Sequence, residues 1–207
     1  MGNVLPVRSL CLVLAVLPVL ASADRLILAP TGNKIRFGQA RLESMFTPDG
    51  DQNRWFLGYG VTKEIELEVT SERFRPGVYR NSLNASFNLM NPLTDFAPGV
   101  SFGVTDALDN TADGRRTYLA VTFRLGLDGD YNQYAPMEAT VGFAYGRGFS
   151  PFVGVMIPLT WQTRLLAEHD GFRVSAGLEF RPLRGLAARY LQVDGKPTWS
   201  LSLTAKF

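Results

Sequence analysis

Most of the chain after residue 38 alternates apolar and polar residues with a period of two, the period of a β-strand with one apolar face. The alternation is clearest in residues 83–89, 118–125 and 172–181. No stretch of ten or more residues has helical periodicity. Weaker alternation is found in nine further segments: 39–46, 54–61, 64–70, 99–106, 138–145, 151–157, 161–169, 186–193 and 199–207. The pattern therefore predicts twelve strands, with ten as an alternative because residues 62–63 and 147–148 leave almost no loop.

The spacing of these segments is that of an up-and-down meander. Residues 39 to 207 number 169, so twelve strands take about 14 residues each with their turns, which suits membrane strands joined by short connections. Asp170-Gly171 and Asp194-Gly195 are strong hairpin signals. We predict an all-β, antiparallel, up-and-down transmembrane β-barrel. A soluble β-sandwich has the same periodicity and is the alternative.

Charged residues occupy the polar face of many of these segments. In a small barrel such residues fill the lumen and pair there with opposite charges, whereas a sandwich leaves them in water. The predicted lumen-facing residues are Arg41, Glu43, Glu64, Glu66, Glu68, Arg124, Arg164, Glu168, Arg173, Glu179, Arg181 and Arg189.

The first 23 residues have the layout of a secretory signal peptide. Arg8 precedes an apolar run from Leu10 to Leu20, and Ala21-Ser22-Ala23 is a small-x-small cleavage site. The run is shorter than the roughly 20 residues that cross a bilayer as a helix. We expect residues 1–23 to be removed, leaving a barrel domain of residues 24–207 that begins at Asp24. Cys11 lies in the removed part, so the mature chain contains no cysteine.

The last segment alternates back from a terminal aromatic residue: Trp199, Leu201, Leu203, Ala205 and Phe207. In this respect the sequence resembles bacterial outer-membrane β-barrel proteins, whose final strand is the signal for the barrel-assembly machinery. The resemblance implies insertion into the outer membrane, with that machinery and membrane lipid as partners.

Two stretches resemble a narrower family. Residues 29–32 ahead of 39–43, and residues 165–170 followed by 177–182, look like parts of YjbH-type proteins, outer-membrane barrels associated with exopolysaccharide production. This resemblance implies polysaccharide as a further partner and a role in its secretion.

Signals for catalysis, metals and nucleic acid are weak. The only histidine, His169, is followed by Asp170, whereas the outer-membrane lipid hydrolases that share this topology have a serine close after their histidine. We expect His169 to be a turn residue, and we expect no catalytic residue, metal site or cofactor. Lys and Arg number 21 against 19 Asp and Glu, so no basic excess suggests nucleic acid as a partner.

The sequence thus predicts a non-catalytic outer-membrane barrel that is an envelope component or a narrow pore, with a link to exopolysaccharide secretion as the finer hypothesis. A secreted carbohydrate-binding sandwich and an outer-membrane lipid hydrolase are the alternatives.

Overall fold

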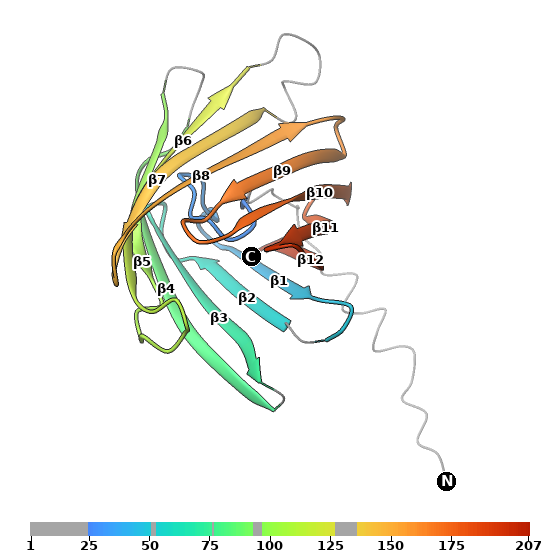
Figure 1. Cartoon of the computed structure of the whole chain (residues 1–207). Helices are drawn as coiled ribbons and strands as arrows, with labels where there is room; N and C mark the ends of the chain where they lie inside the picture. The colour runs from blue at the N-terminus through green and yellow to red at the C-terminus, as the bar shows by residue number, and fades with distance from the viewer. Residues whose placement is uncertain (1–24, 51–52, 76, 93–96, 127–135) are drawn as a thin grey trace.

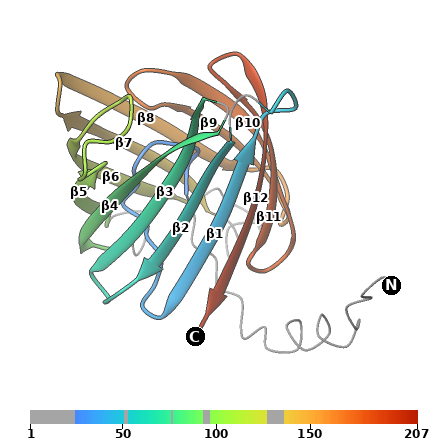
Figure 2. The same cartoon turned by 90° about the horizontal axis from the view of Figure 1, so that it is seen from below.

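Twelve antiparallel strands form a single closed barrel in a computed structural model of the chain (Figures 1 and 2). The structure describes residues 25–50, 53–75, 77–92, 97–126 and 136–207. The expected signal peptide, Cys11 and Asp24 lie outside these residues. The strands are β1 (Gln39–Phe46), β2 (Asn53–Gly60), β3 (Ile65–Arg75), β4 (Val78–Met90), β5 (Gly99–Thr105), β6 (Arg116–Leu125), β7 (Met137–Tyr145), β8 (Phe149–Pro158), β9 (Thr163–His169), β10 (Val174–Leu183), β11 (Leu186–Val193) and β12 (Lys196–Lys206).

The first and last strands close the sheet by pairing with each other. Gln39 is opposite Lys206 and Phe46 is opposite Trp199, in an unbroken antiparallel register. Every other strand pairs with its neighbours in the chain, so the sheet has no edge strand with unpaired backbone groups. The prediction of twelve strands is confirmed. The sandwich alternative, which needs two sheets, is wrong.

Short turns explain why the meander is so regular. Asp194 and Gly195 both have positive φ, 52° and 75°, as the central residues of a type I′ hairpin require. The connections at residues 61–64 and 146–148 are real turns despite their length. The end of the barrel at which β1 ends and β12 begins is called the mouth below.

The alternation predicted from sequence separates the two faces of the sheet. On β12, Trp199, Leu201 and Leu203 face outward and are 40–53% exposed, whereas Ser200 and Ser202 face the lumen and are buried. Exposed large apolar side chains of this kind occur on all twelve strands. The outer surface is therefore an apolar belt around a largely polar interior.

A segment that precedes β1 lies inside the barrel. Residues 25–38 are called the strap below. As far as Ile35 the strap runs through the lumen, as the blue trace enclosed by the strands in Figures 1 and 2, and its last residues lead to β1. Leu26, Ile27 and Ile35 are at most 2% exposed. Ile27 packs in a cluster with Met156, Leu166 and other inward side chains. These residues belong to the predicted barrel domain, but no pattern in the sequence indicates that they fill its lumen.

Glycines on the inner wall make room for the strap. A Cβ at Gly154 of β8 would lie 2.4 Å from Leu26 Cδ1, and one at Gly58 of β2 would lie 2.5 Å from Ile35 Cδ1. Real Cβ atoms do not approach other atoms so closely. The absence of a side chain at these two positions lets two large apolar residues of the strap reach the wall.

Candidate functional site: the lumen and its strap

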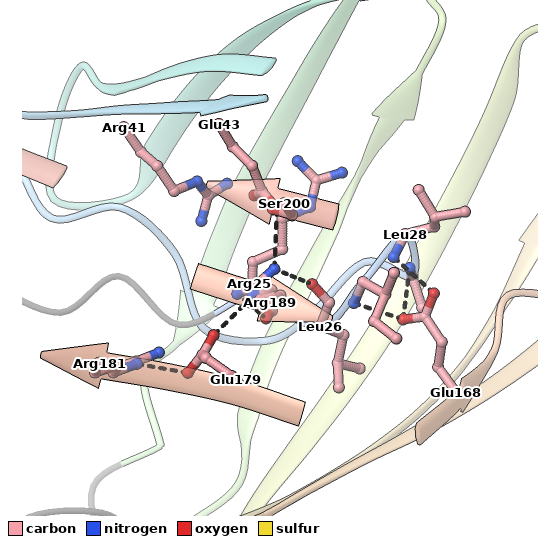
Figure 3. A network of polar contacts seen from close by, with 12 residues as sticks. Arg25, Leu26, Leu28, Arg41, Glu43, Glu168, Glu179, Arg181, Arg189 and Ser200 are labelled. Atoms are coloured by element: carbon pink, nitrogen blue, oxygen red, sulfur yellow. Dashed lines mark hydrogen bonds and ion pairs between the residues drawn. The ribbon is translucent and has the colours of Figure 1, made fainter. Parts of the chain in front are cut away.

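One carboxylate on β9 holds the strap by three consecutive backbone N–H groups. Glu168 accepts hydrogen bonds from the nitrogens of Ile27 at 2.8 Å, Leu28 at 2.6 Å and Ala29 at 3.1 Å (Figure 3). Glu168 is 4% exposed. Backbone donors at a charged acceptor make stronger hydrogen bonds than neutral pairs. The Glu168 carboxylate therefore satisfies the backbone of a strap segment that has no strand partner.

A second contact holds the same segment through its carbonyls. Arg189 of β11 donates to the carbonyl oxygens of Leu26 at 3.4 Å and Arg25 at 3.2 Å. The same guanidinium pairs with Glu43 at 3.0 Å and Glu179 at 2.7 Å. Figure 3 shows Arg189 between these groups. One buried arginine thus joins three strands to the strap.

Further polar contacts complete this network. Ser200 donates to Glu43 at 2.7 Å, and Arg181 donates to Glu179 at 2.5 Å. Glu43 and Glu179 are both fully buried. Replacing such a network piecemeal is costly because it leaves an unpaired charge in a low-dielectric interior.

A separate group of charges lies on β1 and β3. Glu68 accepts from Arg25 at 2.7 Å, Arg41 at 3.2 Å and Asn84 at 3.0 Å. Glu66 accepts from the backbone nitrogen of Ile35 at 2.8 Å, where the strap returns toward β1. The strap is therefore held on opposite sides of the lumen, by β9 and β11 on one side and by β3 on the other.

The strap also contacts the strands between these two sides. Gly32 donates to Thr122 of β6 at 2.7 Å. Asn33 donates to Glu138 of β7 at 2.5 Å, and the same carboxylate pairs with Arg124 at 2.9 Å. These contacts fix the path of the strap across the barrel.

A cavity of about 180 Å³ lies between the strap and the mouth. Leu28, Ala29, Pro30 and Thr31 of the strap form part of its lining. The lining also contains arginine and acidic side chains in nearly equal number: Arg25, Arg41, Arg54, Arg116, Arg173, Glu66, Glu68, Glu72, Asp106, Asp113 and Asp170. The strap thus divides a polar chamber at the mouth from the other end of the lumen.

The structure places ten of the twelve predicted lumen residues on the inner face or in contact with it. They are Arg41, Glu43, Glu66, Glu68, Arg124, Arg164, Glu168, Glu179, Arg181 and Arg189. Arg164, 5% exposed, lies beside the sulfur of Met156 at 3.0 Å.

The other two predicted residues lie in turns outside the strands. Glu64 is exposed in the turn before β3, where its carboxylate accepts from Thr62, so its assignment to the lumen wall is wrong. The alternation extended one residue past the strand end. Arg173 lies in the turn before β10 and pairs with Asp113 at 3.0 Å, so it belongs to the rim of the mouth.

The predicted terminal signal has its side chains outside the barrel. Trp199, Leu201 and Leu203 face outward, Ala205 is partly exposed, and Phe207 is 81% exposed. The backbone nitrogen of Phe207 donates to the oxygen of Gly38 at 2.7 Å, which ties the chain end to the start of β1.

Two groups outside the strands have shifted acidities. Burial lowers the pKa of Lys34 to about 8 from its usual 10.5, although Glu66 and Glu64 act in the opposite direction. Burial acts to raise the pKa of Asp106, but hydrogen bonds from Thr111 and Asn110 hold that pKa below its usual value. The loop after β5 therefore presents an ionised carboxylate at the mouth.

His169 lies at the outer face of β9, where its Nδ1 accepts from the backbone nitrogen of Gly171 at 3.2 Å. Neighbouring inward residues of the strand, such as Glu168, point the other way. Within the described ranges, no group of three or more His, Cys, Asp or Glu side chains could hold a metal ion. The same ranges contain no helix long and apolar enough to span a bilayer.

No protein-family model matches the chain, and no curated protein matches its sequence. Among solved structures, the chain is similar to the outer membrane protein Omp33 of Acinetobacter baumannii, with a TM-score of 0.51. The match covers 82% of this chain and 97% of that chain at 10% sequence identity. The chain therefore has the fold of an outer-membrane β-barrel, although its sequence has little in common with that of Omp33.

Proposed function

We propose that this protein is a non-catalytic, porin-like β-barrel of the bacterial outer membrane, and that the strap holds its pore shut. The observation that carries the location is the apolar belt. Monomeric soluble proteins rarely expose contiguous apolar patches larger than a few hundred Å². Such a belt is stable against the hydrocarbon of a bilayer but unfavourable in water. A closed sheet also leaves no backbone group unpaired in the hydrocarbon.

Fractionation tests the location directly. The protein should stay with the outer-membrane fraction after an alkaline carbonate wash, and its gel mobility should change on boiling. Recovery in the soluble periplasmic fraction, with no change in mobility on boiling, would contradict the proposal. The terminal signal gives a second test, because deletion of Phe207 should reduce membrane yield far more than Phe46→Ala on the partner strand.

The proposal that the pore is closed is supported by the strap that lies in the lumen. The polar chamber at the mouth ends on the strap, which is fixed by Glu168, Arg189 and Glu66. An intact protein should therefore conduct weakly in a planar lipid bilayer. Deletion of residues 25–33, which leaves all twelve strands intact, should produce larger stepwise conductance. Equal conductance of the two proteins would refute the proposal that the strap blocks the pore.

A link to exopolysaccharide secretion is the finer proposal. It is supported by the two stretches that resemble YjbH-type proteins, which meet in the fold where Ala29 of one donates to Glu168 of the other. Removal of the protein should lower the amount of secreted polysaccharide, measured as extracellular sugar. An unchanged amount would restrict the protein to the general role of a pore.

A further inference from the structure

Most charges that line the mouth cavity are already neutralised by a neighbour. Arg54 pairs with Glu72 at 2.7 Å, and Arg173 pairs with Asp113 at 3.0 Å. Deeper in the chamber, Arg25 and Arg41 both pair with Glu68. These groups face the cavity but have little charge left to offer a solute.

Arg116, at the start of β6, differs from these charges in having no carboxylate paired with it among the described residues. Its guanidinium lies over the Phe172 ring at 4.5 Å from the centroid. The charges that act on Arg116 come from Asp170 and Asp113, and Asp113 is engaged by Arg173. Arg116 is therefore held in place by an aromatic ring and retains its charge for another partner.

Asp170, which follows β9, is the matching acid. Its Oδ1 accepts from the backbone nitrogens of Phe172 at 2.8 Å and Arg173 at 2.7 Å. No hydrogen bond to its Oδ2 is found among the described residues, and the side chain lines the cavity. A Cβ at Gly171, where φ is +97°, would lie 3.3 Å from Arg116 Nη2, so this turn packs closely against the arginine.

We propose that the cavity at the mouth binds a small zwitterion of the amino-acid type, with its carboxylate on Arg116 and its ammonium group on Asp170. Five arginines and six acids line the cavity, so a solute with one charge meets repulsion from about as many groups as attract it. A dipolar solute satisfies one unpaired group of each sign. The inference deepens the proposed function by naming the solute class, and it rests on that function for access from outside the cell.

Calorimetric titration of the refolded full-length barrel in detergent micelles, with L-alanine as the probe, tests the site. Saturable one-to-one binding is expected. Arg116→Gln should weaken binding at least tenfold, and Asp170→Asn should do the same, because the asparagine Oδ1 keeps both backbone hydrogen bonds and only the charge is lost. The matched control is Arg115→Gln, since the neighbouring Arg115 is exposed and does not line the cavity.

The outcomes separate this proposal from the pore. A shift of gel mobility on boiling, equal to that of the unsubstituted protein, confirms that each variant is folded, and the titration requires neither insertion into a cell membrane nor conductance. Equal binding of acetate, ethylamine or glucose would overturn the zwitterion assignment, as would equal weakening by Arg115→Gln. A barrel that conducts but does not bind L-alanine would overturn the site and leave the pore standing.

Discussion

The contact between Glu168 and the strap makes the sharpest prediction, because a single substitution removes the charge and keeps the size of the side chain. Glu168→Gln replaces a carboxylate that accepts three backbone N–H groups by an amide with one acceptor oxygen. At least one of the N–H groups of Ile27, Leu28 and Ala29 then faces an NH₂ group and loses its partner. The strap should open more often while the barrel stays folded.

The size of the effect follows from the hydrogen bonds. Hydrogen bonds to a charged group contribute a net 1.5 kcal/mol or more, so three of them are worth about 4.5 kcal/mol. The amide oxygen retains at most two neutral bonds, about 2 kcal/mol together. The difference of about 2.5 kcal/mol corresponds to a roughly 60-fold rise in the ratio of open to closed strap.

Thiol labelling measures this ratio. Ile27 is fully buried, and the expected mature chain contains no cysteine, so Ile27→Cys gives a single reporter that reacts with a maleimide only when the strap leaves the wall. The labelling rate of the Ile27→Cys protein should rise roughly 60-fold when Glu168→Gln is added. Glu72→Gln is the control, because Glu72 lines the same cavity but pairs with Arg54.

Two results would refute the reasoning. One is an unchanged labelling rate in the Glu168→Gln protein, which would mean that packing alone holds the strap. The other is an equal rise with Glu72→Gln, which would mean that any loss of negative charge in the chamber loosens it. For either result to count, the gel mobility of the variant must still shift on boiling as it does in the unsubstituted protein, since a misfolded barrel exposes the reporter thiol.

Four further predictions test other parts of the structure. Gly154→Val should raise strap opening through overpacking of about 1–3 kcal/mol, whereas Gly148→Val, in open space at a turn, should not, as labelling would show. Arg189→Met should lower the free energy of unfolding in urea by about 3–5 kcal/mol, because the buried Glu43 loses its arginine partner and the buried Glu179 is left with Arg181 alone. Leu67→Arg, on the outer face, should cost about 2–4 kcal/mol in lipid vesicles and much less in a soluble protein. Because Lys34 is buried in the folded state, it binds its proton less tightly there than in the unfolded chain, so the free energy of unfolding should rise between pH 8 and pH 10.5. Lys34→Met should abolish that rise in urea titrations.

The sequence alone determined the wall of the barrel. Strand position and face are local properties, since a period of two assigns each side chain to one side of the sheet and turn residues such as Asp194-Gly195 fix the hairpins. All twelve predicted segments are strands, and β1 and β11 match at both ends. The error at Glu64 arose at a strand end, where alternation continues into the turn without a strand to carry it.

Only the tertiary structure decided what fills the lumen inside this wall. Glu43 and Arg189 are 146 residues apart, and no local pattern can select this pair among many possible ones. The strap left no periodic signal, because an extended segment that is enclosed by a barrel contacts apolar and polar wall on all sides. Its traces in the sequence were the apolar run Leu26 to Ala29 and glycines on the inner face, which acquire their meaning only when the closed sheet brings Gly154 and Gly58 against it.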